Sequence, residues 1–270
     1  MAGNGKQGSA IYLSHGGGPL PILGDAQHAE MVRFMKEFAR SRRRPDSIIV
    51  VSAHWEERVP SIISSANPPL LYDYYGFPRE AYSLSYPLPG NPSLAGAIRD
   101  SFAAAGIESE LETSRGFDHG VFIPLMLMYP ESPIPTVQIS LIAGLDPARH
   151  IHMGKALKPL LSENVLIVGS GFSFHNMNAF FSGGDGFDER NDLFQNRLVE
   201  ACTRSASIEA AEKDLIEWER FPGARYCHPR EEHLLPLHAC FGAAGSPERA
   251  GKIVFDDRIL GKRSIAVLWE

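Results

Sequence analysis

Three short apolar runs that end in glycine or histidine constrain the fold of this chain more than any other feature. Residues 11–14 lead into His15 and three glycines, residues 47–53 lead into His54, and residues 165–168 lead into Gly169-Ser170-Gly171 and then His175. Apolar runs of this length bounded by glycine are typical of buried strands. Apolar residues at helical spacing separate the first two runs, which predicts a βαβ unit and a parallel sheet.

The rest of the chain continues this alternation of strands and helices. Further helices are predicted at 92–105, 121–128, 146–161, 187–219 and 229–244, after a first helix at 25–42, and Pro229 is expected at the start of the last one. Further strands are predicted at 60–65, 107–111, 135–141, 252–255 and 264–269. The 270 residues, 44% of them apolar, suffice for a substantial core. We therefore expect one α/β domain over residues 1–270, with a mixed, mostly parallel central sheet flanked by helices.

Charge and hydropathy exclude several classes of partner. The formal net charge is −6, and the longest basic block is the run Arg40-Ser41-Arg42-Arg43-Arg44. This block suits the negative end of a helix dipole better than it suits nucleic acid. No segment approaches 18 consecutive apolar residues, and residues 1–7 lack the apolar core of a signal peptide. We expect neither a nucleic-acid nor a membrane partner.

The cysteines indicate a reducing compartment. Cys202, Cys227 and Cys240 show no C-x-x-C spacing, and their odd number leaves one unpaired in any disulfide scheme. The sequence therefore predicts a soluble, cytoplasmic protein. Assembly into a homo-oligomer is compatible with this composition.

Residues 67–92 differ from the rest of the chain because they combine many prolines with many aromatic residues. Disordered linkers normally lack aromatic residues. Long ordered loops of this kind often form lids or pocket walls, and this is the role we predict. The alternative is an irregular segment that packs on the core.

Histidines mark a candidate site at one edge of the sheet. In open α/β sheets ligands bind outside the carboxyl ends of the strands, where His15, His54 and His175 would emerge. Converging imidazoles favour a metal, and the stretch 227–233 offers further ligands. Two histidines and a carboxylate would make the facial triad of non-haem iron, whereas three histidines suit zinc or iron. Spacing alone leaves Glu232 and His233 as alternatives, with the acids also suited to a first helical turn.

Two other motifs point elsewhere. The HGGG of residues 15–18 resembles a lipase oxyanion hole, and Gly171-Phe172-Ser173-Phe174-His175 resembles G-x-S-x-G. However, His175 replaces the final glycine, and HGGG follows the first strand rather than a later one, so a serine hydrolase is disfavoured. Residues 183–189 suggest a calcium loop but lack the ligand spacing of an EF-hand, and a turn capping the next helix is the better interpretation.

The motifs taken together resemble one known family, the class III extradiol ring-cleavage dioxygenases of the LigB superfamily, and within it the DOPA 4,5-dioxygenase-like branch. The resemblance spans nearly the whole chain and rests on the motifs SHGGGP at 14–19, VSAHW at 51–55, YYGFP at 74–78 with YPLPG at 86–90, FDHG at 117–120, GSG at 169–171 with HN at 175–176, and HP at 228–229 through EHLLPL at 232–237. It implies a divalent metal and insertion of both atoms of O2 into a catechol.

The resemblance also assigns roles to single residues. It implies that His15, His54 and His233 bind the metal, that His175 is the acid/base or a further ligand, and that His119 lies near the substrate. One branch of the family carries glutamate at the third ligand position, whereas this chain follows the three-histidine branch, some of whose members are described with zinc. We expect Fe(II) for turnover and Zn(II) as a metal retained on purification, since the Irving-Williams order favours zinc over iron.

A flat aromatic substrate requires apolar walls, and Tyr74, Phe77, Phe172 and Phe174 are the candidates. Core packing is the alternative for the two last. Two other functions stay open: a zinc hydrolase that uses the same histidines on a water, and a non-catalytic binding protein that keeps the fold.

Overall fold

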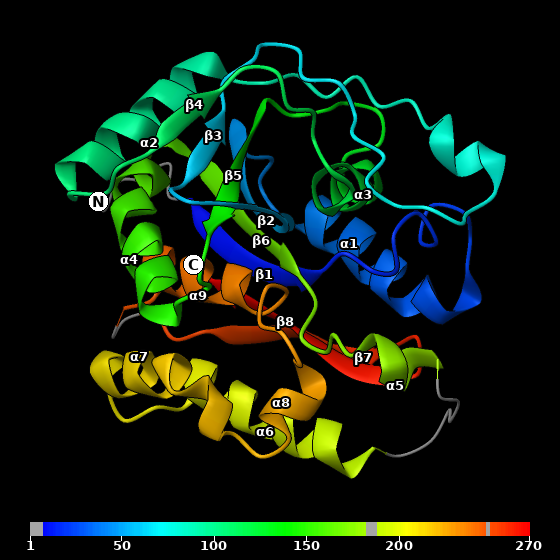
Figure 1. The fold of residues 1–270 in the computed structure, drawn as a ribbon, viewed down its shortest axis with the longest axis vertical. Coiled ribbons are helices and arrows are strands. Elements are labelled where there is room, and N and C mark those ends of the chain that lie inside the picture. Colours follow the sequence, from blue (N-terminus) through cyan, green and yellow to red (C-terminus); the bar gives the residue numbers. More distant parts are fainter. Residues whose placement is uncertain (1–7, 182–187, 247–248) are drawn as a thin grey trace.

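The computed structural model of the protein describes residues 8–181, 188–246 and 249–270. In this part of the chain an eight-stranded sheet has the order β4-β3-β5-β2-β6-β1-β8-β7 (Figure 1). The strands are β1 Ser9–Ser14, β2 Ser47–Glu57, β3 Ser61–Ile63, β4 Glu110–Glu112, β5 Thr136–Ile142, β6 Val165–Gly171, β7 Lys252–Ile259 and β8 Lys262–Trp269.

The centre of this sheet is parallel, and the edges are mixed. Strand β6 lies between β1 and β2 and is parallel to both, while β5 extends the parallel part beyond β2. Strand β8 is antiparallel to β1 and forms a hairpin with β7. Because β1, β2 and β6 run the same way, their carboxyl ends meet at one edge, as the sequence predicts.

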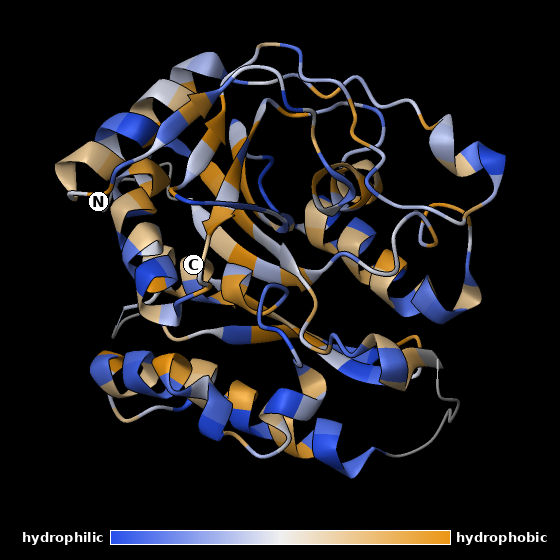
Figure 2. Cartoon of the chain, viewed as in Figure 1, coloured by the Kyte–Doolittle hydropathy of each residue, from blue (hydrophilic) through white to orange (hydrophobic). Residues whose placement is uncertain are grey.

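Helices cover both faces of the sheet. One face packs against α1 (Ala29–Ser41) and α3 (His119–Met128), and the other against α2 (Pro92–Ala104), α4 (Pro147–Leu157), α9 (Leu235–Ala244) and α6 (Glu189–Thr203). The strands alternate accordingly, since Ile11 and Leu13 face the first layer and Ala10 and Tyr12 the second. Apolar colouring follows the central strands in Figure 2. No described helix has the length and apolar character needed to cross a bilayer.

The last predicted helix begins later than expected. Residues 229–234 form turns, and α9 begins at Leu235, so the prediction of a helix from Pro229 was wrong. The proline that occupies the first turn is Pro236 rather than Pro229. The first helical turn considered for the acids of this stretch, Glu231 and Glu232, therefore does not form there. They lie instead in the turn that precedes α9.

Several other boundaries also differ from prediction. The helix predicted at 187–219 is two helices, α6 and α7 (Ile208–Ile216), because Ser207 caps α7 by accepting a hydrogen bond from the backbone of Ala210. Helix α4 ends at Leu157 and continues as a 3-10 helix, and strands β2, β7 and β8 are longer than predicted. The suggested calcium loop lies mostly outside the described residues, but Asp188 does cap α6.

Helices α4 and α9 approach so closely that their glycines are required. A Cβ at Gly154 in α4 would overlap the carbonyl oxygen of Ala239 in α9. Glycine costs a helix interior about 1 kcal/mol relative to alanine, so this close approach is maintained against helix propensity.

We therefore expect Gly154→Ala to lower the free energy of unfolding by about 1–3 kcal/mol, because overpacking outweighs the gain in propensity. Gly96→Ala in α2 is the matched control, since no atom lies within 4 Å of its added Cβ, and it should raise the free energy of unfolding by up to about 1 kcal/mol. Urea titration measures both. A stabilising Gly154→Ala would contradict the tight α4–α9 contact.

Candidate metal centre

His15 follows directly after β1, and its ring is oriented from β6. Its Nδ1 lies 3.1 Å from the hydroxyl oxygen of Ser170. The hydroxyl of Ser170 itself donates to the carbonyl of Gly120, so it can only accept from His15. This contact selects the Nδ1–H tautomer of His15 and leaves the Nε2 lone pair free for a ligand.

His54 lies in β2 at an irregularity in the pairing of this strand with β5. Residues Val51 and Glu56 of β2 pair with Ile139 and Leu141 of β5, so extra residues are accommodated between them. Bulges of this kind often redirect a side chain beside an active site. Two residues before His54, the hydroxyl of Ser52 donates to the fully buried carboxylate of Asp118 at 2.7 Å. Burial raises the pKa of Asp118.

His233 is held against β6 through its own backbone. Its carbonyl oxygen accepts hydrogen bonds from the hydroxyl of Tyr12 at 2.9 Å and from the backbone N–H of Phe172 at 3.1 Å. A Cβ at Gly171 would overlap the same carbonyl. Glycine at 171 therefore lets the turn before α9 pack against the sheet and bring His233 to its edge.

These three imidazoles form a group suited to a metal ion. Ligand atoms of His15, His54 and His233 lie within 4.8 Å of one another, and the Nε2 atoms of His15 and His54 are 2.9 Å apart. Metal–nitrogen bonds of about 2.0–2.1 Å place two neighbouring ligands about 2.9–3.4 Å apart, so this separation fits one ion. Burial, followed by the charge of neighbouring histidines, lowers the pKa of His15. Burial also lowers the pKa of His54 and His233, which favours the neutral form that binds metals.

His119 lies beside this group, at the first residue of α3. Its ring centroid is 3.9 Å from that of His54. The carboxylate of Asp73 accepts hydrogen bonds from the backbone N–H of His119 at 3.0 Å and from its Nδ1 at 2.8 Å. Burial alone would raise the pKa of Asp73, but the contacts with His119 outweigh burial and lower it. His119 therefore presents Nε2 to the site.

His175 lies next to His233, four residues after the end of β6. Its ring stacks on that of His233, with centroids 3.4 Å apart and planes at 15°. Both Nδ1 atoms lie near Oε1 of Glu232, at 3.1 Å for His233 and 3.2 Å for His175. Burial would raise the pKa of Glu232, but the hydrogen bond from His175 and nearby charges lower it overall.

The four predicted wall residues lie in two places. The ring of Tyr74 is 5.7 Å from that of His119 and 5.5 Å from that of Phe77, so both lie on the side of His119. Phe77 also contacts the glycine loop, because a Cβ at Gly18 would come 3.2 Å from its ring. Phe172 and Phe174 are 2% and 0% exposed and both pack on the ring of Phe180. Their placement favours core packing, the alternative left open for them.

The hydrolase motifs have other tasks. The backbone N–H of Gly17 donates to Nε2 of His28 at 3.0 Å, so it is occupied within the protein and does not form an open oxyanion hole. Asp25 in turn holds Nδ1 of His28 at 2.6 Å. Ser173 is fully buried, and its hydroxyl oxygen accepts from the backbone N–H of Ile265. Neither motif forms part of a serine hydrolase site.

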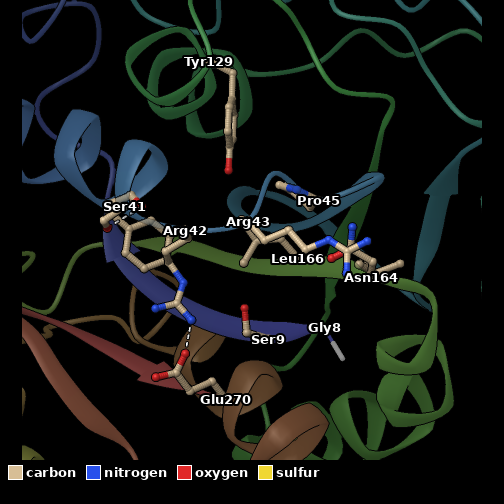
Figure 3. Close-up of a pocket in the computed structure, with 12 residues that line it drawn as sticks. Gly8, Ser9, Ser41, Arg42, Arg43, Pro45, Tyr129, Asn164, Leu166 and Glu270 are labelled. Atoms are coloured by element: carbon tan, nitrogen blue, oxygen red, sulfur yellow. Dashed lines mark hydrogen bonds and ion pairs between the residues drawn. The ribbon is translucent and has the colours of Figure 1, made fainter. Parts of the chain in front are cut away.

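A pocket of about 570 Å³ lies away from the histidines (Figure 3). It is lined by residues from the start of β1 and β6, including Ser9 and Leu166, and therefore lies at the amino ends of these strands. Within it Arg42 forms an ion pair with Glu270 (Figure 3). Cavity volume thus does not identify the candidate site, whose assignment depends on the converging imidazoles.

Sequence reasoning missed the residues that orient these histidines. Ser170, Asp73 and Tyr12 were not singled out, and Glu232 was considered only as an alternative ligand or a helix-dipole acid. A signal existed for Ser170, a polar residue between two glycines at the end of a buried strand. Asp73 offered a similar signal, because it is an acid flanked by the aromatic residues Tyr72 and Tyr74.

Comparison with known proteins adds independent findings. The family model described as the catalytic LigB subunit of aromatic ring-opening dioxygenase matches residues 8–267. The chain is 40% identical to dioxygenase tasH of Hapsidospora irregularis, covering 96% of this chain and 84% of that protein. It is 36% identical to 4,5-DOPA dioxygenase extradiol of Beta vulgaris, covering 89% and 88%. The crystal structure of uncharacterized protein JW3007 from Escherichia coli K12 aligns with a TM-score of 0.79 at 28% identity, over 97% and 99% of the two chains.

The Tyr12 contact leads to a test of how His233 is positioned. Tyr12→Phe removes only the hydroxyl, and we expect a loss of about 1–2 kcal/mol in unfolding free energy and a weaker affinity for Zn(II). Tyr86→Phe is the control, because its hydroxyl bonds to the carbonyls of Leu125 and Tyr129 in α3 and the residue after it. The control should lose similar stability and keep its metal affinity. Chelator competition measures that affinity, and equal affinities in the two variants would contradict the role of Tyr12.

Proposed function

Because the chain belongs to the LigB family of aromatic ring-opening dioxygenases, we propose that it is an extradiol dioxygenase that cleaves a catechol ring with O2 at a metal held by His15, His54 and His233. The observation that carries the assignment of the site is the convergence of these three imidazoles at the carboxyl ends of β1 and β2 and at the turn before α9. The proposed substrate class is a DOPA-like catechol or a related ortho-substituted phenol, following the names of the relatives.

The donor set fits a divalent transition metal. Three neutral imidazoles suit both iron and zinc, and the close pair of Nε2 atoms agrees with two ligands on one ion. When bound at these residues, Fe(II) would pass electrons from the catechol, which is the net reductant, to O2. We propose Fe(II) for turnover and Zn(II) as a competing occupant, since an unselective site favours zinc.

His175 is the proposed acid/base. Its Nδ1 faces Glu232, which leaves Nε2 to take the second catechol proton and later return it, while the carboxylate stabilises the positive charge that the ring acquires. His119 is held in the same way by Asp73, and its Nε2 accepts a hydrogen bond from a ring hydroxyl. His119 next to His54 and His175 next to His233 would each serve one hydroxyl of a catechol.

The segment of residues 67–92, rich in proline and aromatic residues and called here the aromatic segment, supplies the proposed substrate wall. Tyr74 is 8% exposed and its hydroxyl donates to the carbonyl of Ala81, so its ring is fixed and presents an apolar surface beside His119. Phe77 continues this surface toward Gly18, the last of the three glycines that follow His15. Phe172 and Phe174 pack on Phe180 instead, so the proposed wall consists of Tyr74 and Phe77. The free, buried thiols of the described cysteines agree with the proposed cytoplasmic location.

Anaerobic reconstitution with Fe(II) tests the function directly. On admission of air, a catechol panel should show stoichiometric O2 uptake and a yellow ring-opened product. Hydrolysis of esters or amides with Zn(II) and no O2 uptake would instead support a zinc hydrolase. Metal binding without either activity would support a non-catalytic member of the fold.

Replacement of a proposed ligand tests the site. We expect His54→Ala to lose both metal binding and activity, because the ligand group would lose one of its three nitrogens. His152→Ala is the control: this exposed histidine on α4 contacts the carbonyl of Ala105, and its loss should change neither property. Metal content by atomic emission measures the outcome, and retained stoichiometric metal in His54→Ala would refute its role.

His175→Gln separates proton transfer from metal binding. We expect kcat to fall by about 10²–10⁴-fold with the metal retained, because a general acid/base typically contributes that much. Steady-state O2 uptake and metal content are measured on the same samples. Loss of the metal together with the activity would make His175 a ligand instead.

A further inference from the structure

We propose that Asp73 and Glu232 are positioning residues: Asp73 orients His119 and adds a negative charge near His54, and Glu232 orients both His175 and His233. The roles of the four histidines rest on the proposed function, whereas the contacts themselves do not. Each carboxylate lies near two Nδ1 atoms, one from a proposed ligand and one from a proposed base.

Asp73 joins the aromatic segment to the site. Its Oδ1 accepts from both the backbone N–H and Nδ1 of His119, and its Oδ2 faces Nδ1 of His54 at 3.9 Å. Its side chain is 18% exposed. Asp118, the N-cap residue of α3, makes no side-chain capping bond and is instead directed to Ser52 and Gln138. Asp73 therefore supplies from another segment the acceptor that the first turn of α3 needs.

Glu232 joins the turn before α9 to the segment after β6. A single oxygen, Oε1, lies within 3.2 Å of Nδ1 of both His175 and His233, whose rings are stacked. Its side chain is 15% exposed, and Arg230 lies 3.5 Å from its other oxygen. One carboxylate thus sets the relative orientation of a ligand and a base that come from different parts of the chain.

The consequence is a choice of tautomer. A neutral imidazole in water favours the proton on Nε2, where it would block both metal binding and proton acceptance. A carboxylate at Nδ1 reverses this preference and directs the Nε2 lone pair into the site. Without Asp73 or Glu232, the histidines would keep their positions in the chain but lose the orientation of their lone pairs.

Tautomers are directly measurable in the metal-free protein. Nitrogen-15 NMR of histidine-labelled protein should show His119 and His175 protonated at Nδ1 in the wild type. In Asp73→Ala the His119 proton should move to Nε2, and kcat should fall about 10–100-fold with KM changed less than about threefold. Asp73→Ser is a second removal variant with the same expectation, should Asp73→Ala not fold.

The conservative variant distinguishes positioning from charge. In Asp73→Asn the amide oxygen can still accept from the backbone N–H of His119, which fixes the amide orientation and keeps the bond to Nδ1. We expect Asp73→Asn to restore the Nδ1–H signal and most of kcat. Glu80→Ala is the control on the same segment, because Glu80 is exposed and bonds to neither histidine.

Glu232 is tested in parallel. Glu232→Ala should shift the tautomer of His175 and weaken Zn(II) affinity by about 10–100-fold through His233. Glu231→Ala is its neighbour control, since Glu231 pairs with Arg225 instead.

Unchanged tautomers in Asp73→Ala and Glu232→Ala would overturn the proposal, even if activity fell. If the wild type consumes no O2 but the tautomers shift as expected, the positioning role stands and the dioxygenase function fails.

Discussion

The carbonyl oxygen of His233 joins the turn before α9 to strands β1 and β6, and the arrangement of the histidines depends on these contacts. Tyr12 in β1 and the N–H of Phe172 after β6 both donate to it, and Gly171 leaves the space it occupies. These contacts lie at β1 and at the end of β6, two central strands whose residues are almost all buried. The turn before α9 has no regular structure of its own, so its contacts with β1 and with the residue after β6 hold it in place.

Strands β1 and β6 also position His15, because Ser170 of β6 contacts the ring of His15 at the end of β1. Glycines at 169 and 171 let the segment 233–236 press against one face of β6, and the residue between them points to the other face, toward His15. A three-residue motif thus places one histidine by backbone contact and orients another by a hydroxyl. This explains why a G-S-G sequence ends β6 without any nucleophilic role for its serine.

How much the sequence predicts follows from the range of each interaction. The strands β1, β2 and β6 could be predicted because short apolar runs that end at glycine or histidine are local signals, and strand polarity then brought His15, His54 and His175 to one edge. The start of α9 could not, because Pro229 and Pro236 give the same local signal and only the long-range contacts of His233 decide between them. Asp73 escaped prediction for a similar reason, since its partner His119 lies 46 residues away.

The charge balance of the site gives these distant acids a further significance. Three neutral histidines leave the double positive charge of a divalent ion uncompensated within the ligand set, whereas a ligand glutamate would cancel part of it. Here Asp73 and Glu232 lie one step out, at the Nδ1 atoms, and both contacts lower the carboxylate pKa values against the effect of burial. In the proposed centre, their two negative charges would offset the charge of the ion without occupying a coordination position.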